Sequence, residues 1–356
     1  MTADTSALSR TARFPASQRK IRAPFVLDPS LCLYSPQENV DSLSHPLIAE
    51  WITFITERWE PASDGRPRVA LLVPCCKYKP YPVSREHRAI NAALLAAGWR
   101  PSGGVETPSE LLALLDEGED PAVLDVSAWE RDGIVLDRFV ISEPLGVVPY
   151  PLVYRWHGRQ SPATSYDDPG LFEARGTSVS PEHPGFTATP AASGGWKWGP
   201  GEREAYVLMH NRMAEVIAQT FRRVGDAYAG IGAWLSPGLT HRSFLAGSAQ
   251  RDLDGLARSR RGHDDRELPL IGVGDLDAPD IAIMPTQDDL DRARTELAER
   301  LTREGRGGSP GAVRAVYARG DGNDTPLGLP EALRALTRWL DETAVRAGSA
   351  VTEVPA

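Results

Sequence analysis

Apolar residues follow two different periods along the chain, and these predict strands in one set of segments and helices in another. Short apolar runs at residues 69–73, 122–126, 137–148 and 280–284 are typical of strands buried in a sheet. Helical spacing occurs instead in residues 46–59, 87–98, 108–115, 202–224, 287–301 and 330–346. This order of elements indicates an α/β fold, with a mostly parallel sheet flanked by helices.

The chain of 356 residues divides by pattern into three segments. Residues 1–65 form an N-terminal extension with one amphipathic helix, and residues 1–44 have no sustained period, so we expect them to be irregular. Residues 66–245 hold the main α/β unit and the candidate chemistry. Residues 246–356 form a mixed C-terminal extension. The connection at 155–201 is rich in Gly, Pro, Ser and Thr, and its length is typical of a functional loop.

The overall charge and composition narrow the class of protein. A net charge of −9 is unfavourable for a protein that holds nucleic acid by phosphate neutralisation alone. The densest basic run, at 258–261, is followed by acidic residues and fits a solvated loop. No apolar run approaches the ~20 residues of a membrane span, and the N-terminus lacks the apolar stretch of a secretory signal. Three cysteines, two of them adjacent, favour a reducing cytoplasm.

Reactive side chains gather where the first predicted strand ends. The run 69–73 stops at Pro74, and ligands of open α/β sheets bind at the carboxyl ends of strands. A second apolar segment is interrupted in the same way, by Ser142, Glu143 and Pro144, so we expect both interruptions to lie on one edge of the sheet. The first interruption is followed within about a dozen positions by Cys75, Cys76, Lys77, Tyr78, Lys79, Tyr81, Ser84 and His87.

These residue types suit nucleophilic chemistry. Cys75 lies near cationic side chains and just before a predicted helix, and such an environment makes a thiol a usable nucleophile. Lys79 supplies positive potential, and His87 is a candidate proton carrier with Ser84 on the same helical face. Glu143 could orient an attacking amine or water. The predicted catalytic set is therefore Cys75, Lys79, Ser84, His87 and Glu143.

Structural interpretations of the same residues stay open. Cys75 could be a small buried hydrophobe, His87 a capping residue and Glu143 a hydrogen-bond acceptor in a turn. Adjacent cysteines could begin a zinc site, but no second pair of Cys or His follows at ligand spacing. The sequence therefore predicts no metal and no other cofactor.

Two runs resemble a known family. Pro74-Cys75, Lys79-Pro80-Tyr81, Ser84 and His87 resemble, in order and spacing, the signature of the archaeosine synthase catalytic domain. That enzyme belongs to the tRNA-guanine transglycosylase superfamily and acts on 7-cyano-7-deazaguanine. The segment 141–149 is similar to a second run of that domain, and Tyr166-Asp167 resembles a Tyr-Asp pair that follows it. The resemblance covers roughly residues 66–225.

The resemblance implies addition of a nucleophile to a nitrile. It also implies that the substrate is bound by Pro74, Tyr81, Ser142, Tyr166 and Asp167. The chain lacks a transglycosylase barrel and a basic RNA-binding module, so we expect the cyano base to be carried by DNA rather than tRNA. Hydration to a carboxamide is the favoured reaction, and proteins of a DNA-modification system are the expected partners. The alternative is amidine formation with lysine or ammonia, on tRNA or on a free nucleoside.

Two other classes of function compete with this one. A nucleic-acid-associated protein could keep the fold without the reaction, although such a protein needs no thiol beside a proton carrier. A redox protein could use Cys75 and Cys76, but a vicinal pair lacks the usual two-residue spacer.

Overall fold

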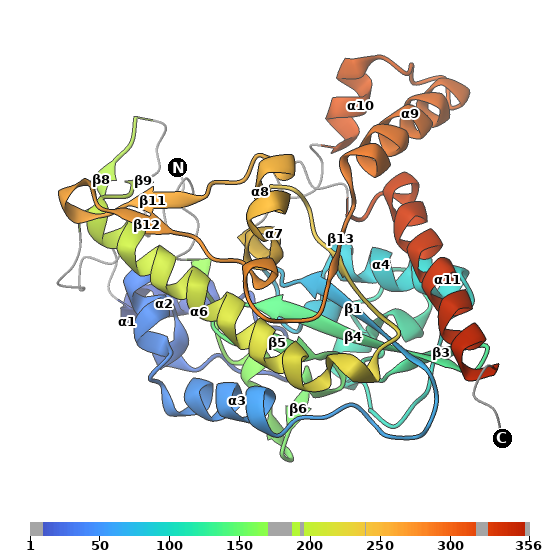
Figure 1. The fold of residues 1–356 in the computed structure, drawn as a ribbon, viewed down its shortest axis with the longest axis horizontal. Coiled ribbons are helices and arrows are strands. Elements are labelled where there is room, and N and C mark those ends of the chain that lie inside the picture. Colours follow the sequence, from blue (N-terminus) through green and yellow to red (C-terminus); the bar gives the residue numbers. More distant parts are fainter. Residues whose placement is uncertain (1–9, 170–186, 193–195, 239, 318–326, 353–356) are drawn as a thin grey trace.

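A seven-stranded sheet forms the centre of the part of the chain that the structure describes (Figure 1). The computed structural model describes residues 10–169, 187–192, 196–238, 240–317 and 327–352. The strand order is β13-β10-β1-β4-β3-β2, and β5 also pairs with β4. The parallel strands are β13 (Ala282–Met284), β10 (Gly230–Trp234), β1 (Arg68–Pro74) and β4 (Ile134–Ser142). Antiparallel pairing adds β2 (Arg100–Pro101), β3 (Trp129–Arg131) and β5 (Gly146–Pro149).

Two groups of helices pack on this sheet, which confirms the predicted α/β class. In one group, α6 (Pro200–Val224) packs on β5 and alongside α3 (Pro46–Glu57). In the other group, α11 (Pro330–Thr352) packs on β1, β4 and β10 and alongside α4 (Arg85–Ala96). The apolar face of each helix is thereby removed from water, as its spacing predicts.

The predicted helices are confirmed, and shorter elements join them. The predicted helix at 108–115 is limited to α5 (Ser109–Leu112). Short two-stranded pairs form in the loops: β6 (Arg155–Trp156) with β7 (Arg159–Gln160), β8 (Thr189–Pro190) with β9 (Trp196–Lys197), and β11 (Ser259–Arg261) with β12 (Glu267–Pro269). The remaining α-helices are α1 (Arg10–Gln18), α2 (Pro36–Ser42), α7 (Thr240–Leu245), α8 (Ser248–Asp254), α9 (Gln287–Arg303) and α10 (Pro310–Tyr317).

Three expectations about local structure are wrong. Residues 122–126 are not a strand, because Asp120 caps a 3₁₀ helix at Pro121–Leu124 by accepting from the amide of Ala122. Residues 137–148 are not one strand, because the chain turns at residues 143–145 and β5 pairs back on β4. Residues 10–44 are not wholly irregular, because they contain α1 and α2. In the first two cases a proline or a capping side chain redirected an apolar run, and in the third two short helices formed without a sustained apolar period.

One hydrophobic core draws on all three segments that the sequence pattern separated. Leu31 from the N-terminal segment, Leu136 from β4 and Leu336 from α11 are all fully buried in it. A smaller cluster around Leu297 and Leu301 lies under α9 and α10. The N-terminal and C-terminal segments therefore belong to the same packed unit as the sheet.

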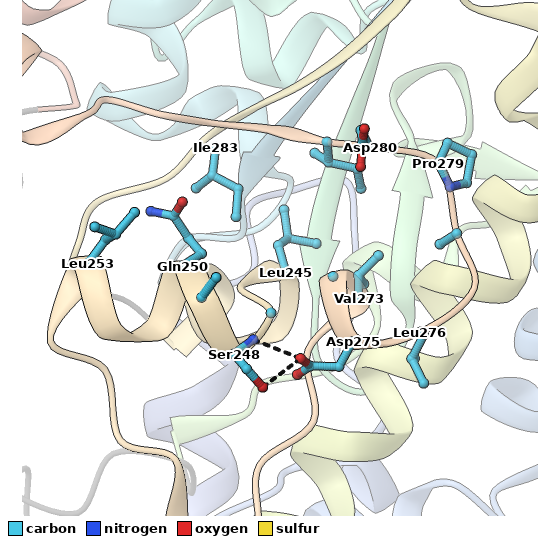
Figure 2. A pocket seen from close by; sticks show the side chains of 15 residues that line it. Leu245, Ser248, Gln250, Leu253, Val273, Asp275, Leu276, Pro279, Asp280 and Ile283 are labelled. Carbon is cyan, nitrogen blue, oxygen red and sulfur yellow. Dashed lines mark hydrogen bonds between the residues drawn. The ribbon is translucent and has the colours of Figure 1, made fainter.

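A pocket with a volume of about 520 Å³ lies between α8 and the chain at 273–283 (Figure 2). Its lining includes the carboxylates of Asp275 and Asp280 but no lysine, arginine, histidine or cysteine. Asp275 is engaged with the amide and hydroxyl of Ser248. The pocket therefore lacks the groups that the predicted nucleophilic chemistry needs.

Among the described helices, none has the length and apolar character required to cross a membrane.

Candidate active site

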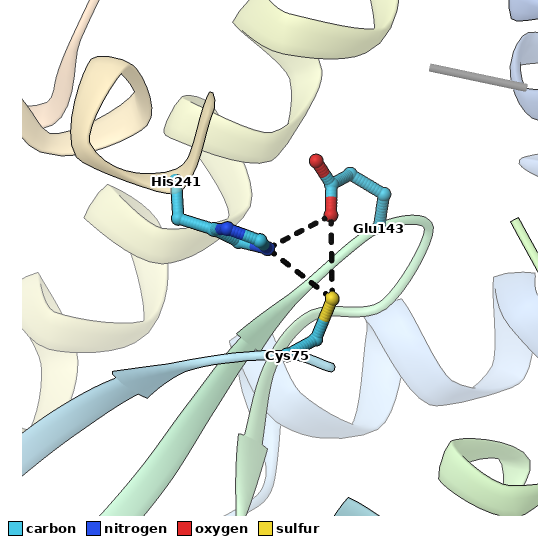
Figure 3. A group of neighbouring side chains, drawn as sticks. All are labelled: Cys75, Glu143 and His241. Carbon is cyan, nitrogen blue, oxygen red and sulfur yellow. Dashed lines mark hydrogen bonds and ion pairs between the residues drawn. The ribbon is translucent and has the colours of Figure 1, made fainter. Parts of the chain in front are cut away.

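Three neighbouring parallel strands bring Cys75, Glu143 and His241 together (Figure 3). Cys75 directly follows β1, and Glu143 directly follows β4. His241 lies in α7, the helix that comes after β10. Because β10, β1 and β4 are adjacent and parallel, their carboxyl ends meet at one edge of the sheet. The predicted placement of Cys75 and Glu143 on one edge is confirmed.

The reactive atoms of this trio lie within contact distance of one another. The Nε2 atom of His241 is 3.3 Å from the Sγ atom of Cys75 and 3.2 Å from Oε2 of Glu143. The Sγ atom of Cys75 is 4.0 Å from the same carboxylate oxygen. Glu143 and His241 are 4 % and 5 % exposed, whereas Cys75 is only half-buried. The thiol is thus the member of the trio that solvent or a substrate reaches most easily.

The buried charges of Glu143 and His241 stabilise each other. Burial disfavours the imidazolium of His241, but its interactions with the Glu143 carboxylate and the Cys75 sulfur outweigh burial and hold the pKa of His241 well above its usual range. Burial would raise the pKa of Glu143, but attraction to His241 prevails and lowers it. At neutral pH the structure therefore holds an imidazolium between a carboxylate and a sulfur atom.

The arrangement of the trio differs from a linear relay. In a Ser-His-Asp relay the nucleophile and the carboxylate occupy opposite nitrogens of the imidazole. Here both approach Nε2 of His241, and Nδ1 is buried without a hydrogen-bond partner among the described residues. One N–H is therefore shared between Cys75 and Glu143. This convergence on a single point suits either a shared proton or a bound cation.

Lys79 adds a second buried charge pair beside the trio. Its Nζ atom lies 3.3 Å from Asp168 and 4.5 Å from the ring centre of Tyr166. Burial opposes the ammonium form, but interactions with Asp168 and with the Cys75 sulfur raise the pKa of Lys79. Burial raises the pKa of Asp168 to about 6, against the attraction of Lys79. Lys79 therefore acts as a fixed positive charge, as the sequence analysis predicts, and not as a proton donor near neutral pH.

Three of the predicted substrate-binding residues form a closed hydroxyl network. The hydroxyl of Tyr81 lies 2.9 Å from that of Tyr166 and 3.1 Å from Oγ of Ser142, and Ser142 also bonds Tyr166. All three side chains have no exposed surface. Because these side chains are fully buried, neither tyrosine ring offers a free face to a base.

Asp167 is another predicted substrate-binding residue that is engaged within the protein. Ser17 donates to its Oδ2 atom at 2.5 Å, and the ammonium of Lys20 lies 2.6 Å from the same oxygen. Both partners come from the N-terminal segment, whose backbone also bridges to Lys79. Asp167 thus fastens the N-terminal segment to the wall of the site.

The structure does not support the proton-carrier role predicted for His87. Its Nε2 atom donates to the carbonyl of Pro74 at 2.8 Å, and its Nδ1 atom lies 2.6 Å from the hydroxyl of Tyr150. Burial lowers the pKa of His87 to about 4, so the ring stays neutral. Ser84 caps α4 by accepting from the His87 amide. Both ring nitrogens of His87 are thus engaged in hydrogen bonds within the protein. The imidazole that lies beside the Cys75 sulfur is that of His241.

Sequence reasoning missed His241, Asp168 and Lys20. His241 follows β10 by several residues, and the run of β10, Gly-Ile-Gly-Ala-Trp, gives a weak strand signal. Asp168 directly follows the Tyr166-Asp167 pair, and the second of the two adjacent acids proved to be the partner of Lys79. Lys20 carried no local signal.

Comparison with family models, curated proteins and solved structures finds no match to this chain.

Proposed function

We propose that this protein adds a nucleophile to the nitrile of a 7-cyano-7-deazaguanine nucleotide in nucleic acid. The favoured reaction is hydration to the carboxamide, with DNA as the carrier of the base. The observation that supports an enzyme is the convergence of a half-buried thiol, an imidazolium and a carboxylate at Cys75, His241 and Glu143. The identity of the base rests on the sequence resemblance.

In the first step, the Cys75 sulfur attacks the nitrile carbon and forms a C–S bond. One π bond of the nitrile breaks, and its nitrogen takes the proton from Nε2 of His241. The product is a neutral thioimidate and a neutral imidazole. Lys79 lies nearby as a fixed cation and favours the anionic sulfur before attack. An imidazolium that is held buried beside the sulfur supplies this proton without reorganisation.

In the second step, water adds to the thioimidate carbon, with Glu143 as its base. The carboxylate of Glu143 relays one water proton to the nitrogen, which becomes the NH₂ of the amide. The second water proton returns to His241 as the C=O bond forms and the C–S bond breaks. Thiolate, imidazolium and carboxylate are thereby restored. An amine in place of water would give an amidine by the same sequence of bonds.

The test is a reaction of the purified protein with a synthetic oligodeoxynucleotide that carries the cyano base. Nucleoside mass spectrometry should show conversion to a product heavier by one water. Cys75→Ala should abolish conversion, whereas Cys76→Ala should preserve it, because the Cys76 sulfur is turned toward the carbonyl of Tyr78 at 2.9 Å. Parallel reactions on tRNA and on the free nucleoside, with and without an added amine, identify the carrier and the nucleophile.

Two results would contradict this proposal. One is an unchanged cyano base in all three carriers under every condition. The other is full activity of Cys75→Ala, which would remove the covalent step. Intact-protein mass spectrometry of the wild type, quenched during turnover, provides a further check, because the thioimidate should appear as a covalent adduct that Cys75→Ala does not form.

A further inference from the structure

We infer that Cys75, Glu143 and His241 also form a binding site for one divalent cation of the zinc class. The three donor atoms come from three separate segments and lie within 4.8 Å of one another. This inference goes beyond the proposed reaction, because it concerns what the resting protein binds. It can be tested on the protein alone.

The separations between donor atoms fit a tetrahedral ion. Zinc bonds of about 2.3 Å to sulfur and about 2.0–2.2 Å to nitrogen and oxygen require donor–donor separations of roughly 3.4–3.6 Å. The structure has 3.3 Å between sulfur and nitrogen, 3.2 Å between nitrogen and oxygen, and 4.0 Å between sulfur and oxygen. Small shifts of the three side chains therefore suffice to bring all three atoms into coordination.

The chemistry of the donors favours zinc over magnesium or calcium. Thiolate and imidazole are the ligands that zinc prefers, whereas magnesium and calcium prefer oxygen donors. A thiolate and a carboxylate together carry two negative charges, so a Zn²⁺ ion that displaces the Nε2 proton of His241 to solvent yields a neutral centre. Lys79 is the nearby cation that opposes binding, but its charge is matched by Asp168 at 3.3 Å.

The burial of the three ligands and the number of protein ligands also fit a zinc site. Two ligands, Glu143 in the turn after β4 and His241 in α7, are almost fully buried, while Cys75 is half-buried. With three protein ligands, a tetrahedral ion keeps its fourth position for water, as in catalytic zinc sites. The grouping of all three donor atoms within 4.8 Å of one another is what ligands of a single ion require.

A bound zinc ion and the nitrile compete for the same sulfur. A thiolate bound to Zn²⁺ is a weaker nucleophile than a free thiolate, and a zinc ion on Nε2 of His241 replaces the proton that the first step requires, so the zinc form should not carry out the covalent step. Zinc is thus an inhibitor of the proposed reaction, and a chelator restores it.

The experiment uses reduced full-length protein, stripped with a chelator and dialysed against Zn²⁺. Metal analysis should find one zinc per chain in the wild type and in Cys76→Ala, the neighbouring-thiol control. Loss of a side chain that only orients a ligand weakens metal binding about 10–100-fold. Loss of a ligand itself should cost more, so Cys75→Ala and His241→Ala should weaken zinc affinity by more than about a hundredfold. Glu143→Gln should weaken it by at least about tenfold. With Co²⁺, the wild type should show a sulfur-to-cobalt charge-transfer band that Cys75→Ala lacks.

Circular dichroism of each variant distinguishes loss of a zinc ligand from loss of the fold. Wild-type protein that retains no zinc after dialysis would overturn the inference. So would equal zinc affinity in wild type, Cys75→Ala and His241→Ala, because the metal would then lie elsewhere. Neither result bears on nitrile hydration, which is measured separately in the presence of chelator.

Discussion

His241 is the residue on which the charge balance of the site depends. Its imidazolium is buried, and it persists because Glu143 and Cys75 lie beside Nε2. The proposed first step needs this proton, so activity should be lost as pH rises through the raised pKa of His241. Below that pH His241 stays protonated, and Glu143, whose pKa is lowered by attraction to His241, should remain a carboxylate into acidic pH.

Replacing the carboxylate provides a direct test of this dependence. Glu143→Gln removes the negative charge 3.2 Å from Nε2 and keeps the shape of the side chain. Burial then dominates, and the pKa of His241 should fall toward or below its ordinary value. NMR titration of the imidazole C–H signals measures this shift. The signal of His87, whose nitrogens bond Pro74 and Tyr150, serves as the internal control. An unmoved His241 titration in Glu143→Gln would contradict the assigned pair.

At the scale of elements, the hairpin between β4 and β5 determines where Glu143 lies. Gly146 opens β5 with a φ of 75°, and a Cβ atom there would meet Val216 of α6 at 2.3 Å. Gly133, in the turn that leads into β4, has a φ of 79° and nothing within 4 Å of such an atom. Both glycines thus have a positive φ, but only Gly146 is packed closely against a neighbouring helix.

Alanine at these two glycines should therefore have unequal effects. Gly133→Ala should cost roughly 1–2 kcal/mol for the left-handed backbone alone. Gly146→Ala should cost about 1–3 kcal/mol more, because the methyl group overpacks against Val216. Urea unfolding measures both, and adding Val216→Ala to Gly146→Ala should recover part of the extra cost. Equal destabilisation by the two single substitutions would show that the helix contact has no effect.

The distance of each site residue from the end of its strand explains which of them the sequence could predict. Cys75 and Glu143 directly follow their strands, so a buried apolar run ending at a polar residue located both. His241 is separated from β10 by a loop, and β10 contains two glycines that a strand pattern disfavours. Gly232 is nevertheless required there, because a Cβ atom would meet the Trp339 ring at 2.5 Å. The need for glycine at this position therefore comes from the packing of α11 on the sheet, which the hydrophobic pattern of β10 alone does not indicate.

At the scale of the whole molecule, the segments that the sequence separated at residues 65 and 245 depend on one another. Lys20 and Ser17 bind Asp167, and the backbone at Ile21 bridges to Lys79. From the other end of the chain, α11 packs on β1, β4 and β10, and β13 completes the parallel part of the sheet. The sheet that carries the site is thus packed and extended by segments from both ends of the chain.

A fragment of residues 66–245 should therefore fail to fold as a unit. It keeps Cys75, Glu143 and His241 but loses β13 beside β10 and the α11 cover of the sheet. Apolar sheet surface left in water disfavours the folded state in proportion to its area. The intact chain should give a cooperative thermal transition by circular dichroism, and the fragment should give none. A fragment with a sigmoidal transition and dispersed amide NMR signals would instead establish 66–245 as an independent domain, with the two flanking segments as additions to it.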